Sequence, residues 1–342
     1  MDPTSGKRYL PRKLPPAPRS IGKVNLQARN PYDRTTLVSI FLGIDGGGSK
    51  TACAVGDETT LLGTGIAEGS NVVRVGERQA GEAIASAVRQ ACAAALVNPK
   101  QVERTCVGVA GAARPEIAET IRKALAELVS GEIEVVGDMV IASEAAQGSG
   151  PGVIVIAGTG SIAYGRNSAG RTARAGGWGF AISDEGSGQW IGRMAVSATM
   201  RAYDEGQTTM LLDTTMKSWG VSTREQVILS ANASPPPNFA ALLPAVLTAA
   251  DAGDATAHDI LAQAGAELAT LAGIVISRIF EDTKDVPVAM SGGVFGNSAL
   301  VRRVFYNSLR LKCPGVVVNT DIVEPVKGAL ELARKGARRP SP

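Results

Sequence analysis

Two glycine-rich turns, about a hundred residues apart, carry the residue types that hold phosphate groups. The first reads Asp45-Gly-Gly-Gly-Ser-Lys-Thr51 and the second reads Gly158-Thr-Gly-Ser161, each after an apolar run. Glycine lets backbone N–H groups approach an anion because no Cβ stands in the way. Hydroxyls and an ammonium group in the same turns suit phosphate oxygens. The pair predicts a polyphosphate held between two halves of the chain, and therefore nucleotide-dependent phosphoryl transfer.

Neither turn fits the two commonest phosphate-binding motifs. A P-loop requires glycine, four residues and then Gly-Lys-Ser/Thr, but Ile44 and Ser49 occupy the two glycine positions that precede Lys50. Gly158–Ala163 fits a relaxed dinucleotide fingerprint, yet that motif must open a helix. The chain continues instead into Asn167-Ser-Ala-Gly170, a turn composition. A β-hairpin is the favoured interpretation.

Three aspartates are candidates for the rest of this chemistry. Asp45 ends the first expected strand, where a carboxylate beside a phosphate-binding loop can hold Mg²⁺, although an isolated Asp-Gly pair is more often a hairpin residue. Asp138 follows a strand and can accept the proton of an attacking hydroxyl; the alternative is a helix N-cap. Asp184, within Gly176–Gly188, can bind hydroxyl groups or cap the next helix.

Other residues are candidates for the site only in combination with these aspartates. Trp178 offers an apolar face, and Asn71 is either a turn residue or a ligand for a sugar hydroxyl. Ser291–Asn297 reads as a strand–turn–helix entry, whose N–H groups can meet a nucleotide. His258 lies at a polar helix start and is expected at the solvated surface.

Composition narrows the class of protein. The length of 342 residues suggests two domains, and the first 40 residues hold six prolines, eight basic and two acidic residues. The remaining chain therefore has a net charge of −3, which gives no electrostatic footprint for nucleic acid. Residues 1–38 are predicted to be a disordered basic extension, and no apolar run is long enough to span a membrane. Four scattered cysteines and one histidine argue against a zinc site and indicate buried thiols in a cytoplasmic protein.

The apolar pattern predicts one arrangement of elements twice. In the first half we expect strands at 39–45, 50–56, 60–67, 105–110 and 133–136, with helices at 74–96, 115–129 and after Asp138. In the second half we expect strands at 153–157, 160–166, 171–175, 286–290 and 315–318, with mostly helical sequence over 185–281 and helices at 297–311 and 325–335. Such repetition indicates a duplicated α/β domain with a hinge near 148–152.

Together these motifs resemble those of N-acetylglucosamine kinases and, more broadly, of the BadF/BadG/BcrA/BcrD-type ATPase family within the sugar kinase/Hsp70/actin superfamily. The resemblance covers residues 41–336. It implies a duplicated ribonuclease H-like (actin-like ATPase) α/β fold with two domains around a cleft. The expected domains are 39–148, joined by a returning helix at 322–337, and 149–321.

The resemblance also implies a role for each motif residue. Asp138 aligns with the catalytic base, and Asp45 with an acidic residue near Mg²⁺. The sugar-binding positions are Asn71, Gly177, Trp178 and Asp184. The nucleotide-binding positions are Gly46, Gly47, Gly48, Ser49, Lys50, Thr51, Thr159, Gly160, Ser161, Gly292 and Gly293. Ala110-Gly111 departs from members in which a serine contacts the sugar, which leaves the identity of the sugar open.

The expected activity is that of an ATP- and Mg²⁺-dependent amino-sugar kinase, in the first place an N-acetylglucosamine kinase acting on the 6-hydroxyl. Glucosamine, N-acetylmuramic acid and glucose stay open as acceptors. A non-kinase ATPase switch or activator is the alternative; activators in this family hold an iron–sulfur cluster through cysteines, and none flanks Gly158–Ile162. Sugar and ATP are the expected partners, without nucleic acid or membrane, and family analogy suggests a homodimer.

Overall fold

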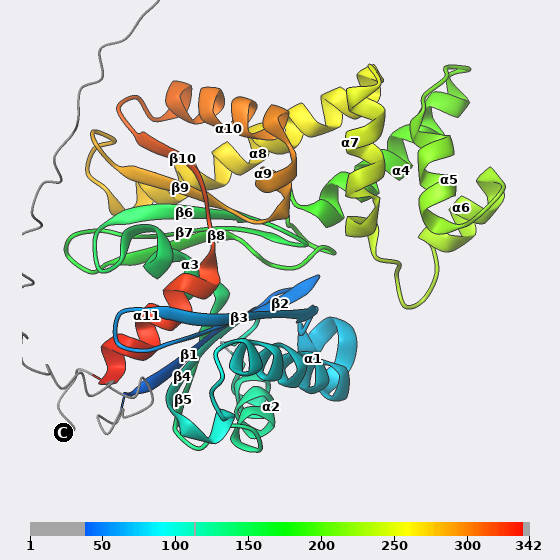
Figure 1. Ribbon diagram of the computed structural model, residues 1–342. Helices are drawn as coiled ribbons and strands as arrows, with labels where there is room; N and C mark the ends of the chain where they lie inside the picture. Colours follow the sequence, from blue (N-terminus) through cyan, green and yellow to red (C-terminus); the bar gives the residue numbers. More distant parts are fainter. Residues whose placement is uncertain (1–37, 113, 338–342) are drawn as a thin grey trace, which may run out of the picture. The chain divides into compact units, whose positions relative to one another are not determined.

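The computed structural model describes residues 38–112 and 114–337 and contains two five-stranded sheets with helices packed on them (Figure 1). The predicted extension at residues 1–38 lies outside the described residues, apart from Val38. Helices and strands occur where the apolar pattern predicted them, with differences at a few ends.

The first sheet has the order β3-β2-β1-β4-β5. Its strands are β1 (Ile40–Gly46), β2 (Lys50–Gly56), β3 (Leu61–Glu68), β4 (Val102–Val109) and β5 (Glu132–Gly137). β1, β2 and β3 form an antiparallel meander, and β4 and β5 run parallel to β1. The carboxyl ends of β1, β3, β4 and β5 therefore lie at one edge of the sheet, where the loops that follow them can converge.

The second sheet has the order β10-β9-β6-β7-β8. Its strands are β6 (Gly152–Ala157), β7 (Ser161–Arg166), β8 (Thr172–Gly176), β9 (Pro287–Ser291) and β10 (Val317–Val323). β6, β7 and β8 form the antiparallel meander, and β9 and β10 run parallel to β6. Because this topology matches that of the first sheet strand for strand, the predicted duplication is confirmed. The β6–β7 hairpin also confirms that Gly158–Ser161 does not open a helix.

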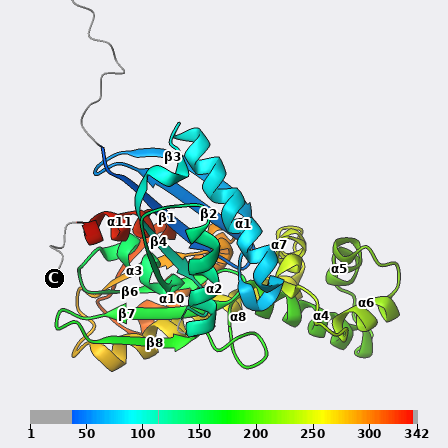
Figure 2. The ribbon, with the colours of Figure 1, turned by 90° about the horizontal axis from the view of Figure 1, so that it is seen from below.

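Helices cover both faces of the first sheet. α1 (Val72–Ala94) and α2 (Pro115–Ala126) lie on one face (Figure 2), and α3 (Asp138–Gln147) and α11 (Pro325–Ala337) lie on the other (Figure 1). Alternate residues of β1 serve these two layers: Leu42 and Ile44 pack with α1, whereas Phe41 packs with α3 and α11. This explains why β1 reads as a continuous apolar run.

The C-terminal helix α11 returns to the first sheet, as the resemblance implied. A Cβ at Gly43 of β1 would lie 2.2 Å from the backbone nitrogen of Leu330, so strand and helix are in backbone contact. Arg334 donates hydrogen bonds to the carbonyl oxygens of Asp57 at 2.7 Å and Thr60 at 2.9 Å, in the β2–β3 turn. The domain boundaries near 148 and 321 stay predictions.

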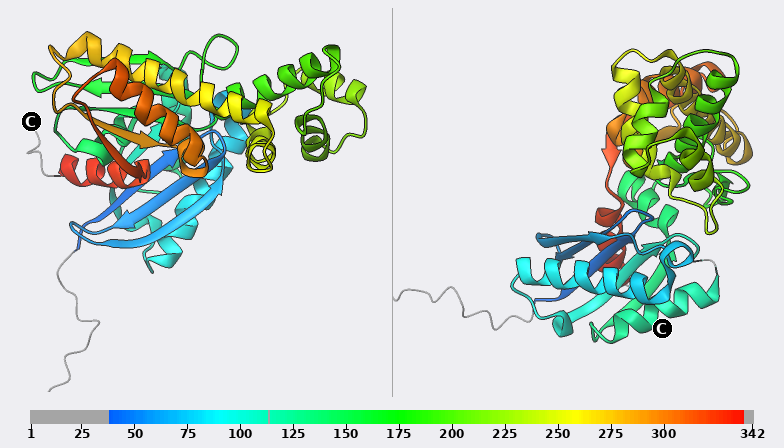
Figure 3. Two further views of the ribbon diagram at one scale, coloured as in Figure 1. Left: turned by 90° about the horizontal axis from the view of Figure 1, so that it is seen from above. Right: turned by 90° about the vertical axis from the view of Figure 1, so that its right-hand side faces the viewer.

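The second sheet packs against the predicted long helix, α8 (Ala255–Ile279), and against α10 (Ala299–Lys312), as Figure 3 shows. α8 is the one helix among the described residues that is long and apolar enough to cross a membrane by length and composition, and more than half of that stretch is buried within the protein. The remaining helices are α4 (Gly188–Asp204), α5 (Leu211–Trp219), α6 (Arg224–Ala231), α7 (Leu243–Asp251) and α9 (Gly293–Asn297), with 3₁₀ turns at Pro99–Gln101 and Phe239–Leu242.

Candidate functional site

Two of the predicted aspartates lie near each other at the carboxyl edge of the first sheet. Asp45 ends β1 beside its pairing partner Ala52, and Asp138 follows β5. Burial, and then the charge of Asp138, raise the pKa of Asp45 to about 7, while Lys50 opposes that shift. Burial also raises the pKa of Asp138. A buried carboxylate whose pKa is raised by a neighbouring carboxylate favours a bound cation or a shared proton.

Asp138 is the first residue of α3 and not its N-cap. The cap is Gly137, which has no capping side chain, and Asp138 Oδ1 accepts a hydrogen bond from the Met139 N–H at 2.9 Å. The carboxylate thus sits on the first turn, where the helix dipole favours negative charge. The N-cap alternative is wrong in detail, and a chemical role stays compatible with this position.

The first glycine turn touches the second. Gly47 N–H donates to the Lys50 carbonyl oxygen at 3.0 Å and closes the turn, and the Ser49 and Thr159 hydroxyl oxygens lie 2.8 Å apart. A Cβ at Gly48 would lie 2.8 Å from Thr159 Oγ1, so glycine is required for this approach. The expectation that the two turns face each other is therefore met within the described residues.

Asp184 lies directly behind the second glycine turn. Its side chain is buried and its φ is 71°, and a Cβ at Gly160 would come within 3.1 Å of Asp184 Oδ2. Burial raises the pKa of Asp184, while N–H groups of Ser161 and Gly179 that donate to the carboxylate oppose the rise. Asp184 does not cap α4, because Ser187 does so by accepting from the Trp190 N–H at 3.1 Å.

Gly292 joins the entry of α9 to the same turn. Its φ is 100°, and a Cβ there would lie 2.3 Å from the Ala157 carbonyl oxygen and 2.9 Å from the Gly158 nitrogen. Gly293, the first residue of α9, is exposed. The N–H groups at this helix start lie beside the second glycine turn, as a nucleotide site requires.

The residues predicted to bind the sugar lie in different environments. Asn71 caps α1, where its Oδ1 accepts from the Val73 N–H at 3.1 Å, which leaves its amide group for another contact. Trp178 is 60% exposed, and the Arg174 guanidinium lies 4.1 Å from the centre of its ring. Gly177 beside it has a φ of 71°. No hydrogen bond in the described part of the chain joins Asn71 or Trp178 to the three aspartates.

Thr51 and Ser161 differ from the other predicted phosphate ligands because their hydroxyls are buried. Thr51 Oγ1 is within hydrogen-bonding distance of the Glu68 carbonyl oxygen and of Ser70 Oγ, and Ser161 Oγ donates to the Glu185 carbonyl oxygen. The residue that sequence reasoning missed is Ser70, whose only signal was its place before Asn71 in Gly-Ser-Asn. Phosphate binding by Thr51 and Ser161 stays a prediction.

The carboxylates of the site suit Mg²⁺ better than a metal ion whose ligands all come from the protein. Among residues 38–112 and 114–337 no group of three or more His, Cys, Asp or Glu side chains is placed to hold a metal. Mg²⁺ is commonly held by one or two carboxylates together with water and substrate phosphates. Asp45 beside two glycine turns meets that description, and the nearby charge of Asp138 adds to the negative potential there.

Comparison with known proteins points in one direction. The model of the BadF/BadG/BcrA/BcrD ATPase family matches residues 42–333. The chain is 31% identical over 298 residues to an N-acetylmuramic acid/N-acetylglucosamine kinase of Clostridium acetobutylicum, a match over 86% of this chain and 97% of the relative. It is 29% identical over 311 residues to the N-acetyl-D-glucosamine kinase of Dictyostelium discoideum, over 86% and 97% of the two chains.

Solved structures show the same fold. A candidate N-acetylglucosamine kinase from Chromobacterium violaceum superposes with a TM-score of 0.71 and 25% identity, over 87% of this chain and 99% of the other. A ROK family glucokinase from Streptomyces griseus, solved with glucose and AMPPNP, gives a TM-score of 0.58 at 18% identity, over 87% and 100%. The second likeness concerns the fold alone.

Proposed function

The chain belongs to the BadF/BadG/BcrA/BcrD ATPase family, and we propose that it is an ATP-dependent amino-sugar kinase that phosphorylates the 6-hydroxyl of N-acetylglucosamine. The observation that carries this proposal is the contact between the two glycine turns through Ser49 and Thr159, beside the carboxylates of Asp45, Asp138 and Asp184. A pure ATPase switch needs the turns but has no use for an acceptor pocket with its own carboxylate.

Asp138 is the proposed general base. Burial raises the pKa of its carboxyl group, which brings it nearer to the range in which a carboxylate takes a proton effectively from an attacking hydroxyl. Asp45 would hold Mg²⁺, which when bound supplies positive charge to the phosphates of ATP. Backbone N–H groups of Gly48, Ser49, Thr159 and Gly160 would hold the β- and γ-phosphates in line with the acceptor.

Asn71, Gly177, Trp178 and Asp184 form the proposed sugar site. A buried carboxylate such as Asp184 accepts hydrogen bonds from sugar hydroxyls, and it gains partners there that replace lost water. An exposed tryptophan supplies an apolar face for a sugar ring. The expected homodimer and cytoplasmic location remain part of this proposal.

N-acetylmuramic acid is the second candidate acceptor, because one relative is named for it and basic residues lie at the acceptor edge. Arg74 follows Asn71 in the first turn of α1, and desolvation lowers its pKa without any acidic neighbour contributing. Arg114 is the N-cap of α2, after β4. Either guanidinium would suit the lactyl carboxylate that distinguishes N-acetylmuramic acid. If Arg74 binds this carboxylate, Arg74→Gln should lower kcat/KM for N-acetylmuramic acid more than for N-acetylglucosamine; equal losses would exclude Arg74 from that role.

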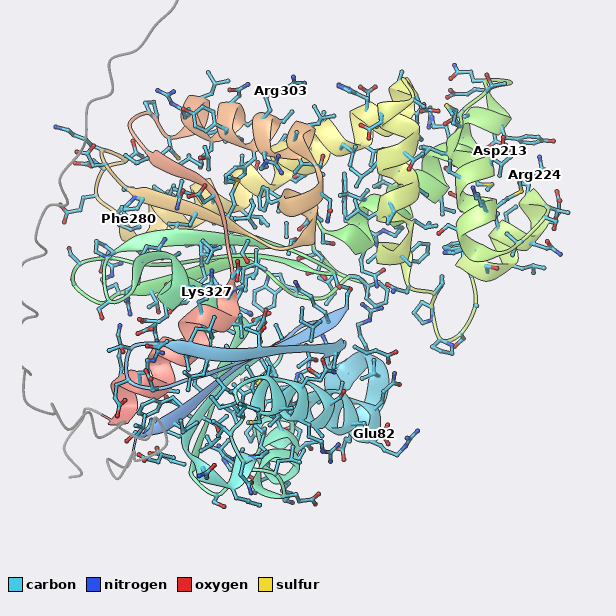
Figure 4. All side chains as sticks on the ribbon, in the orientation of Figure 1. Glu82, Asp213, Arg224, Phe280, Arg303 and Lys327 are labelled. Carbon is cyan, nitrogen blue, oxygen red and sulfur yellow. The ribbon has the colours of Figure 1, made fainter. Side chains whose placement is uncertain are left out.

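The test is ADP release from Mg·ATP with N-acetylglucosamine, N-acetylmuramic acid, glucosamine and glucose in turn. One amino sugar should stimulate release strongly, and Asp138→Asn should reduce that turnover by about 100-fold or more with sugar binding retained in calorimetry. Asp213→Asn, at an exposed residue of α5 (labelled in Figure 4), is the matched control and should behave as wild type. Release that no sugar stimulates would point to the ATPase switch, and near-normal turnover in Asp138→Asn would remove the base assignment.

A further inference from the structure

Thr51 and Ser161 occupy the same position in the two copies of the fold. Thr51 pairs with Gly46, the last residue of β1, and Ser161 pairs with Ala157, the last residue of β6. The turns between them differ in length, so this equivalence appears in the strand pairing and not in the sequence spacing. Ser161 is the first residue of β7 and Thr51 the second of β2, so each lies at the start of the strand that returns from a glycine turn.

The Thr51 hydroxyl links the first glycine turn to the loop that carries Asn71. It is fully buried, 2.7 Å from the Glu68 carbonyl oxygen and 2.8 Å from Ser70 Oγ. Since one hydroxyl has one proton and can also accept, both contacts can form together. Ser70 N–H in turn donates to the Gly47 carbonyl oxygen at 3.1 Å. The loop and the turn are thus joined at Thr51 and at Gly47.

The Ser161 hydroxyl makes the corresponding link in the second copy. It is 3% exposed and donates to the carbonyl oxygen of Glu185, the residue after Asp184, at 2.8 Å. The Ser161 hydroxyl therefore bonds to the loop that carries Asp184, another proposed sugar ligand. In each copy, a hydroxyl ties a phosphate turn to an acceptor loop.

We infer that Thr51 and Ser161 are positioning residues that hold the acceptor loops in register with the glycine turns, and that their hydroxyls do not bind phosphate. The inference rests on the proposed function. Its physical reason is that in-line transfer needs the acceptor hydroxyl at a fixed distance from the γ-phosphate, and a displacement of about 1 Å can cost roughly 100-fold in rate. A buried hydroxyl that is hydrogen-bonded to the acceptor loop, as each of these two is, is suited to set that distance.

The test compares transfer to sugar with transfer to water. Thr51→Val keeps the shape of the side chain and removes the hydroxyl, and Ser161→Ala removes the other. We expect kcat for sugar phosphorylation to fall about 10-fold or more in each, whereas ADP affinity and the slow hydrolysis of ATP without sugar change less than about 2-fold. Thr51→Ser restores the hydroxyl and should recover most of kcat. If the variants lose ADP affinity and their rates of ATP hydrolysis and sugar phosphorylation fall equally, the two hydroxyls bind phosphate. That outcome would overturn the inference.

A matched control and a ligand-free readout separate positioning from general damage. Thr199 is another buried threonine, whose hydroxyl donates to the Ala195 carbonyl oxygen at 2.8 Å within α4, and Thr199→Val should leave kcat unchanged. Hydrogen exchange of the free protein should become faster over 68–73 in Thr51→Val and over 184–188 in Ser161→Ala, and only there. Unchanged exchange in these loops would overturn the inference. Because this readout needs no turnover, it stands even if the proposed function fails.

Discussion

At the scale of single residues, the site contains carboxylates whose ionised forms are destabilised by burial. Burial raises the pKa of Asp45, Asp138 and Asp184, so each ionised form is less favourable in the folded protein than in water. Their positions at strand ends could be predicted from the sequence. That Asp184 lies buried behind Gly160 could not, because it depends on a loop with left-handed backbone folding over the β6–β7 turn.

The pKa of Asp45 predicts how stability depends on pH in the absence of ligand and metal. Its folded-state pKa of about 7 lies above the unfolded value of 3.8, so ionisation destabilises the fold. The penalty is absent below pH 4, grows as pH rises through this window and is complete above 7. Asp45→Asn should therefore be more stable than wild type by about 4 kcal/mol at pH 8 and close to wild type at pH 4, in urea unfolding.

Asp57 provides a control of opposite sign. Its carboxylate accepts from the N–H groups of Thr59 and Thr60, and these bonds lower its pKa. The stability that this carboxylate contributes is present above its unfolded pKa and disappears as pH falls through the folded value. Asp57→Asn should thus lose stability at pH 8 and approach wild type in acid. If both variants shift in the same direction at pH 8, the assignment of Asp45 as an uncompensated charge is wrong.

At the scale of elements, alternating apolar residues and glycine turns predicted every strand of the two sheets. Three features differed. The expected helix 297–311 begins two residues later, at Ala299, because Ser298 has an extended backbone and caps α10 through Val301, and the short α9 precedes it. β10 runs to Val323 through a register shift against β9, and α1 starts at Val72 with a non-helical Gly76. The five residues of α9 are too few to show a helical period in the sequence. The register of β10 depends on its partner strand, which is distant in the sequence.

Gly69 tests how closely the loop after β3 must approach the first glycine turn. A Cβ there would lie 2.4 Å from the Gly48 carbonyl oxygen, a backbone atom that can move only with the turn. Gly69→Ala should therefore lower kcat/KM for ATP by about 10-fold or more, measured as ADP release at saturating sugar. The matched control is Gly81→Ala in α1, where a Cβ would meet Ala124 at an ordinary 3.6 Å.

The control should leave activity unchanged and raise the free energy of unfolding by roughly 0.5–1 kcal/mol, since alanine favours a helix interior over glycine. Wild-type kinetics in Gly69→Ala would show that the turn can move without loss. The local packing of the phosphate turn would then have no bearing on nucleotide binding.

At the scale of the whole molecule, duplication is visible in the sequence, but the assignment of helices to sheets is not. Two meanders with glycine turns predicted two sheets of equal topology. The last helix could be placed on the first sheet only through the family resemblance, because its apolar face fits either sheet. Its packing depends on contacts such as Gly328, where a Cβ would lie 2.0 Å from the Ile141 carbonyl oxygen of α3.

The proposed division into 39–148 plus 322–337, and 149–321, can be tested through α11. Leu330 is buried with Phe41 and Ile141, so Leu330→Ala should cost about 2–4 kcal/mol and accelerate hydrogen exchange in β1, β2 and β4 before β6–β8. Leu309→Ala in α10, equally buried but in the core of the second sheet, should give the reverse order. If both variants accelerate exchange in the two sheets together, the chain opens as one cooperative unit and the division is wrong. If the orders differ as expected, the chain's last helix is energetically part of its first domain, and a truncation before Pro325 would remove support from the sheet that carries Asp45 and Asp138.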